Sequence, residues 1–135
     1  MVKLIMDAQG SGKTKELVAS INEAVKNESG SIVCIEKGSK LRYDINYRVR
    51  LIDIEEYHTG DPVFLQGFLS GLHAGNFDIT HVFIDSLYKV IGNEPEKVLA
   101  FLNWCDAFSQ KNDIRFTFTV SDDPATAPED MKKYF

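Results

Sequence analysis

The residues with the clearest chemical potential lie near the start of the chain, in the run Asp7-Ala8-Gln9-Gly10-Ser11-Gly12-Lys13-Thr14. Glycines let backbone N–H groups converge on phosphate oxygens without obstruction from side chains. Lys13 can reach the outer phosphates as a mobile point charge, and the hydroxyl of Thr14 can bind a magnesium ion. We therefore predict a phosphate-binding site at Gly10, Ser11, Gly12, Lys13 and Thr14.

The segments on either side of this run support that prediction. Residues 2–6 have the apolar character of a short strand. Residues 14–27 carry apolar side chains at the spacing of one helical face, at Leu17, Val18, Ile21, Ala24 and Val25. A helix that begins near Lys13 adds its unpaired N–H groups and the positive end of its dipole to the site. A glycine run between a strand and a helix is the setting in which such a sequence binds phosphate.

A second acidic position follows a strand-like run later in the chain. Asp85 ends the apolar run Val82-Phe83-Ile84. In a parallel sheet this aspartate emerges at the carboxyl edge, where the glycine run also lies. We predict that Asp85 holds Mg²⁺, through water, opposite Thr14, so that Thr14 and Asp85 are the metal-binding residues.

The residue that would activate a water molecule is less clearly marked. Ser86, not a carboxylate, follows Asp85. Glu36 ends the apolar run 31–36 and is the best remaining candidate, which makes Lys13, Asp85 and Glu36 the predicted catalytic residues. The alternative is that Glu36 only starts a Glu-Lys-Gly turn. Ser121, Asp122 and Asp123 close the last predicted strand, where a polar group could contact the terminal phosphate or cap a turn.

The run that ends in Gly12-Lys13-Thr14 resembles the Walker A motif of the P-loop nucleoside triphosphatases, and residues 82–85 resemble a Walker B strand. The whole chain also resembles small uncharacterised bacterial ATP-binding proteins of about this length. The resemblance implies ATP and Mg²⁺ as cofactors. Asp7 departs from the family pattern, which has its first glycine there. A carboxylate about 8 Å from one phosphate charge costs about 2 kcal/mol at an effective dielectric of about 20, so we expect weakened binding.

Three functions fit these residues. The first is ATP binding with slow or partner-stimulated hydrolysis. The second is a non-catalytic module for nucleotide binding or protein interaction, favoured by Asp7 and by the missing glutamate after Asp85. The third, a small-molecule kinase, has less support, because the chain has no basic lid with paired arginines and little length for a substrate site.

The alternation of strands and helices along the chain predicts the fold. We expect strands at residues 2–6, 31–36, 49–54, 80–85 and 114–120, with an extended or hairpin segment before the third. Helices are expected at residues 14–27, 61–74 and 95–109, with a short terminal helix at 128–135. The sequence therefore predicts an α/β fold: a three-layer α/β/α sandwich with a mainly parallel sheet of about five strands, forming a single domain over residues 1–135.

Composition limits the partners of the protein. The net charge of −5 argues against broad nucleic-acid binding. The sequence still allows a local basic patch, because basic residues lie close together at Lys37, Lys40, Arg42, Arg48 and Arg50. The interleaved Tyr43, Tyr47 and Tyr57 could stack on bases, or could be the solvent-facing side of an edge strand. A protein partner or a homo-oligomer also stays open.

The two cysteines, Cys34 and Cys105, lie in apolar surroundings and are expected to be core residues in a reducing compartment. The first residues lack the order of a signal peptide. No apolar stretch is long enough to span a bilayer, so we expect no membrane insertion. Together these features predict a cytoplasmic protein.

Overall fold

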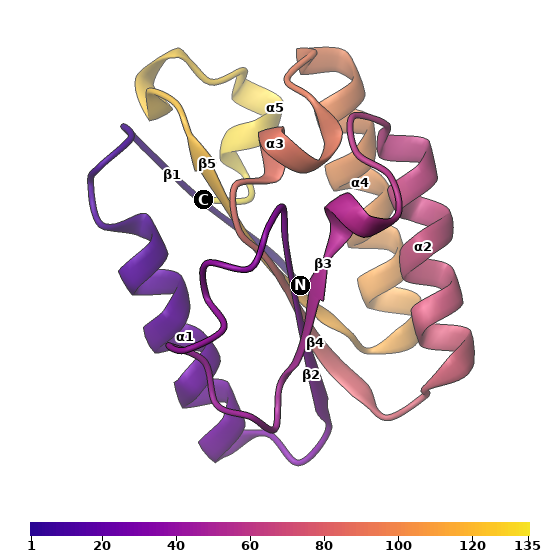
Figure 1. Cartoon of the computed structure of the whole chain (residues 1–135). Coiled ribbons are helices and arrows are strands. Elements are labelled where there is room, and N and C mark those ends of the chain that lie inside the picture. Colours follow the sequence, from indigo (N-terminus) through magenta and orange to yellow (C-terminus); the bar gives the residue numbers. More distant parts are fainter.

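A computed structural model describes all residues, 1–135, and shows a five-stranded sheet between helices (Figure 1). The strands are β1 (Val2–Asp7), β2 (Ser31–Glu36), β3 (Arg50–Asp53), β4 (Ile79–Ile84) and β5 (Arg115–Ser121). Their order in the sheet is β1-β5-β4-β2-β3, and every neighbouring pair is parallel. The predicted three-layer α/β/α fold is therefore confirmed.

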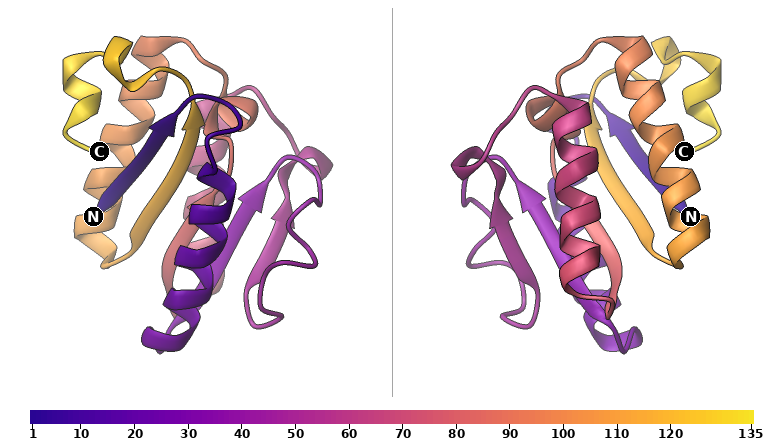
Figure 2. Two further views of the ribbon diagram at one scale, coloured as in Figure 1. Left: turned by 90° about the vertical axis from the view of Figure 1, so that its left-hand side faces the viewer. Right: turned by 90° about the vertical axis from the view of Figure 1, so that its right-hand side faces the viewer.

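The helices cover both faces of the sheet (Figure 2). Helix α1 (Lys13–Asn27) lies on one face, whereas α2 (Pro62–Gly75) and α4 (Pro95–Asn112) lie on the other. In β4, Phe83 packs in the cluster beneath α1, and its neighbours Val82 and Ile84 pack in the cluster beneath α2 and α4. Because both faces are covered, strands of this kind are apolar at successive positions and do not alternate with polar residues.

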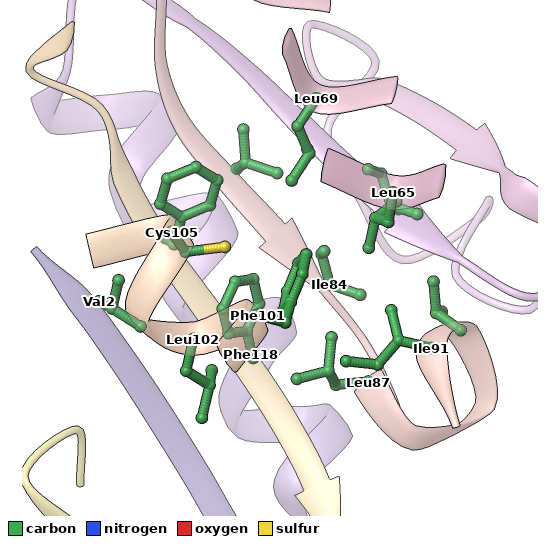
Figure 3. Packing of buried hydrophobic residues seen from close by; sticks show 14 of the residues in the cluster. Val2, Leu65, Leu69, Ile84, Leu87, Ile91, Phe101, Leu102, Cys105 and Phe118 are labelled. Carbon is green, nitrogen blue, oxygen red and sulfur yellow. The ribbon is translucent and has the colours of Figure 1, made fainter. Parts of the chain in front are cut away.

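The larger core lies between the sheet, α2 and α4 (Figure 3). Phe101 of α4 contacts Phe118 of β5, with ring centroids 5.9 Å apart. Both cysteines are free and fully buried, as expected of core residues. Burial raises the pKa of the Cys34 and Cys105 thiols, which keeps both neutral.

Two segments differ from the predictions. Helix α3 (Leu87–Ile91) was not expected, since five residues are too few to show a helical period. Residues 40–48 form turns in place of an extended or hairpin segment. Leu41 and Val49 in and beside this segment are buried against α1, so their apolar character reflects tertiary packing, not strand alternation.

The two edge strands of the sheet, β1 and β3, differ in what lies beside them. The C-terminal segment, with α5 (Glu129–Lys132), packs beside β1, where Leu4 N–H donates to the carbonyl of Tyr134 at 2.7 Å. The opposite edge, β3, pairs only with β2. A short 3₁₀ turn at Ile54–Glu56 follows β3 before α2 begins. None of the helices combines the length and the apolar character that crossing a membrane requires.

Candidate functional site

The carboxyl ends of the strands meet beside a cavity of about 780 Å³. All strands are parallel, so the residues that end them lie at one edge of the sheet. The cavity is lined by the continuous stretch from Gln9 to Lys15, together with Glu36, Asp85 and Ser121. The structure therefore brings every predicted binding and catalytic residue to one cavity, although they are distant in the sequence.

The glycine loop, residues 8–12, owes its shape to two glycines in left-handed conformations. Gly10 has φ +82° and Gly12 has φ +94°, values that side-chain-bearing residues rarely adopt. No atom lies within 4 Å of the place where a β-carbon would stand at either position, so the loop backbone is open. Helix α1 begins directly afterwards and no side chain caps its first turn, which leaves N–H groups facing an incoming anion.

Lys13 is folded back over this loop. Its side chain is buried, with 7% exposed, and its Nζ donates a 2.9 Å hydrogen bond to the carbonyl of Ala8. The charge therefore lies above the loop and not out in solvent. A carbonyl is a neutral acceptor, and a phosphate oxygen would form a stronger, charge-assisted bond in its place.

Thr14 and Asp85 come together across 71 residues of sequence. Thr14 Oγ1 lies 3.5 Å from Asp85 Oδ1, the outer limit for a hydrogen bond. Asp85 is held from β5, where the hydroxyl of Thr119 donates to the same Oδ1 at 2.8 Å. Its N–H donates to the carbonyl of Ile35 on β2 at 3.0 Å. The carboxylate is thus fixed through one oxygen, while Oδ2 has no protein partner.

Ser86, next to Asp85, has an unusual backbone. Its φ of 56° and ψ of 63° lie in the left-handed region, which costs a residue with a side chain about 1–2 kcal/mol. The N–H of Ser86 donates to Thr119 Oγ1 at 2.7 Å, so one threonine hydroxyl holds both residues of this turn. Strain that persists in this way clusters at functional sites, and Ser86 also lines the cavity.

Glu36 is buried, with 3% exposed, and both of its carboxylate oxygens are occupied. Oε1 accepts from the N–H of Lys40 at 3.2 Å, and Oε2 accepts from the N–H of Leu41 at 3.0 Å. Burial raises the pKa of Glu36, the two N–H groups oppose this rise, and the charge of Asp85 adds to it. Glu36 therefore anchors the turn that follows β2 and also lines the cavity.

The cavity is positively charged although the chain is acidic. It is lined by five lysines, Lys13, Lys15, Lys37, Lys40 and Lys89, against two carboxylates, Glu36 and Asp85. This is a formal excess of three positive charges in a chain with net charge −5. A concave site with such an excess attracts an anionic ligand.

Asp7 does not line this cavity. Its Oδ1 accepts from the N–H of the adjacent Ala8 at 2.8 Å, which turns the carboxylate back onto its own loop. The side chain is exposed and borders a separate shallow hollow beside Phe135. Ser11 and Lys13 line the same hollow, so the Asp7 carboxylate lies beside the glycine loop but outside the larger cavity.

Several lining residues were missed by the sequence reasoning. Tyr88 and Lys89 reach the cavity through the unpredicted helix α3. Thr119 does not line the cavity but holds Asp85, and it was missed because it lies within the strand run Phe116-Thr117-Phe118-Thr119. Of the three polar residues Ser121, Asp122 and Asp123, which end and follow β5, Ser121 alone lines the cavity. Asp123 instead accepts from the N–H of Ala125 at 2.9 Å, capping a turn.

Comparison with protein-family models and with curated proteins gives no match for this chain.

Proposed function

We propose that this chain binds ATP together with Mg²⁺ at the glycine loop, and that it hydrolyses ATP slowly or when a partner stimulates it. The observation that carries the proposal is the 3.5 Å approach of Thr14 Oγ1 to Asp85 Oδ1, beside an open glycine loop in a lysine-rich cavity. A hydroxyl and a carboxylate in this position supply two of the oxygen groups that Mg²⁺ prefers.

The chain's own residues suit the two ligands. The loop backbone is open at Gly10 and Gly12, and Lys13 can exchange its bond to Ala8 for a phosphate oxygen. No group of three or more His, Cys, Asp or Glu side chains is placed to hold a metal alone. Mg²⁺ would therefore share its coordination with phosphate and water, and when bound it would neutralise part of the phosphate charge.

Slow hydrolysis follows from the residues around Asp85. Ser86 cannot act as a carboxylate base at the next position. Glu36 is the remaining candidate, but both of its oxygens already accept N–H bonds from Lys40 and Leu41. Protonation of either oxygen would weaken the N–H bond that this oxygen accepts, so proton transfer from water to Glu36 works against this turn. A partner that moves the turn would lower that cost.

The test is a titration of ATP, with and without Mg²⁺, into the wild type, Lys13→Ala and Asp85→Asn. We expect Lys13→Ala to raise Kd about tenfold or more, because a hydrogen bond to a charged group contributes about 1.5–3 kcal/mol. Asp85→Asn should remove the Mg²⁺ dependence. Lys26→Ala is the matched control, since Lys26 is exposed at the far end of α1. Wild-type protein that does not bind ATP, or equal binding by Lys13→Ala, would contradict the proposal.

A second candidate is a non-catalytic nucleotide-binding module. The engagement of both Glu36 oxygens by backbone N–H groups favours it. Phosphate release under saturating ATP separates the two. Slow release that disappears in Asp85→Asn supports hydrolysis, whereas tight binding without any release supports the module.

A further inference from the structure

The segment that joins β2 to β3, together with the first residue of β3, concentrates positive charge. Residues 37–50 contain five basic residues, Lys37, Lys40, Arg42, Arg48 and Arg50, and one acidic residue, Asp44. The net charge of this basic segment is +4, so the remainder of the chain carries −9 to reach the total of −5. We propose that the basic segment binds single-stranded nucleic acid.

The segment also presents the most exposed large aromatic side chains of the protein. Tyr43 is 86% exposed and Tyr47 is 93% exposed. The guanidinium of Arg42 lies over the ring of Tyr43, with Cζ 5.0 Å from the centroid. Exposed aromatic rings beside cations are what proteins use to stack bases and hold the connecting phosphates.

A groove of about 610 Å³ runs between the basic segment and β3. Its lining includes the three arginines, Arg42, Arg48 and Arg50, with Tyr47 and Tyr57. The ion pairs of the protein involve other residues, and no arginine of the groove lies within 4.0 Å of a carboxylate. The carboxylate of Asp53, also in the groove, already accepts from the N–H groups of Gly38 and Glu55 at 2.8 and 3.0 Å. The guanidinium groups are therefore available to phosphates.

The basic segment is held in place before any ligand binds. Leu41 and Val49 are buried against α1, with 3% and 7% exposed. Asn22 of α1 donates to the carbonyl of Asp44 at 3.4 Å and accepts from the N–H of Asn46 at 3.3 Å. A surface that is ordered in advance loses less entropy when it binds.

The shape and chemistry favour nucleic acid over an acidic peptide. An acidic peptide would use the arginines but would leave Tyr43 and Tyr47 without a function, whereas bases give both rings a stacking partner. Lys37 and Lys40 line the candidate ATP cavity, and Gly38 and Arg42 line the groove, so one turn contacts both sites.

The test uses a fluorescein-labelled dT oligonucleotide of about twelve nucleotides, a length within the usual span of single-strand sites of about 4–16. Anisotropy is measured without ATP, so that the result does not depend on the proposed ATP binding. We expect wild-type protein to bind at low salt, and Arg48→Ala/Arg50→Ala to bind about tenfold more weakly. The slope of log K against log salt should fall by about 0.7 for each phosphate that the variant no longer neutralises. The charge-matched control is Lys26→Ala/Lys111→Ala, two exposed helical lysines.

Tyr47→Ala tests stacking separately from charge. It should weaken binding about fivefold or more with an unchanged salt slope, and Tyr47→Phe should bind as wild type does. Binding of an rU oligonucleotide in place of dT, or binding of both, also supports the proposal and shows whether the segment takes RNA, DNA or either. Absence of binding, equal loss in the control, or equal competition by polyglutamate would overturn it. Because Tyr47, Arg48 and Arg50 are exposed, melting temperatures of the variants should match the wild type.

Discussion

The hydroxyl of Thr119 on β5 donates a 2.8 Å hydrogen bond to Oδ1 of Asp85 at the end of β4. Thr119 is 1% exposed, and its oxygen also accepts from the N–H of Ser86 at 2.7 Å. One buried side chain therefore sets the orientation of the carboxylate and holds the strained turn beside it. Strand β5 lies between β1, which leads into the glycine loop, and β4, which is followed by Asp85.

Replacing Thr119 with valine should separate this orientation from packing. The shape is nearly kept, but the N–H of Ser86 loses its partner and Asp85 is free to rotate. We expect a loss of about 1–3 kcal/mol in unfolding free energy, the cost of an unpaired buried polar group. The Mg²⁺-dependent part of ATP affinity should fall, whereas affinity without Mg²⁺ should not. Thr119→Ser keeps the hydroxyl and should keep the Mg²⁺-dependent ATP affinity of the wild type, and an equal loss of that affinity in both variants would refute the assignment.

The left-handed conformation of Gly12 makes Gly12→Ala a sensitive probe of the loop. At φ +94° a β-carbon costs about 1–2 kcal/mol, and it would project into the space available for phosphate. Gly71→Ala is the control, because Gly71 is an exposed position of α2 with open space around it and no positive φ. That control should gain about 0.5–1 kcal/mol. Chemical denaturation should show a lower unfolding free energy for Gly12→Ala and a higher one for Gly71→Ala. ATP titration should show weaker binding for Gly12→Ala than for the control.

Asp7→Gly distinguishes the sequence argument from the structural one. A carboxylate about 8 Å from a phosphate would cost about 2 kcal/mol, which is roughly thirtyfold in affinity. With the Asp7 carboxylate turned onto the N–H of Ala8, we expect the gain on substitution to be less than about fivefold. ATP titration at low and high salt measures it. A thirtyfold gain that shrinks with salt would mean that the carboxylate does face the phosphates.

His81 gives the protein a predicted loss of stability in mild acid. Its Nδ1 lies 3.0 Å from Glu28 Oε2, its Nε2 lies 2.8 Å from Thr117 Oγ1, and its ring stacks on Phe83. Burial lowers the pKa of His81, and Glu28 opposes this only in part, while Arg115 adds to the lowering. The unfolded chain therefore binds the proton more tightly than the folded protein. Stability from this group is complete above its ordinary pKa of 6.5 and falls as the pH drops through that value.

Melting temperatures measured between pH 7.5 and pH 5 test whether His81 makes the protein less stable as the pH falls. This range lies on either side of the ordinary histidine pKa of about 6.5. His81→Gln should lie below the wild type at the upper end, and the difference should narrow as the pH falls. His58→Gln is the control, because His58 is exposed, and its curve should run parallel to the wild type. A wild-type advantage that widens on acidification would mean that protonated His81, paired with Glu28, stabilises the fold.

Local sequence was sufficient for the five strands and for helices α1, α2, α4 and α5, but not for α3. Each of these elements could be predicted from adjacent residues alone. Examples are the apolar runs of β2 and β4, the helical period of α1 and the Asp61-Pro62 start of α2. The observed α2 begins at Pro62, with Asp61 accepting from the N–H groups of Val63 and Phe64. The prediction of an extended or hairpin structure for residues 40–48 was wrong. The apolar residues of this segment pack against α1, a contact that no local pattern reveals.

The glycine loop was determined by the sequence itself, since left-handed glycines followed by a helix start are local properties of residues 8–13. Only the tertiary structure decided what surrounds that loop. It turned Asp7 away, placed Asp85 within 3.5 Å of Thr14 and held it through Thr119, and added lysines from helix α3 and the basic segment. The physical reason is that parallel strands bring their carboxyl ends to one edge, whatever the distance between them along the chain.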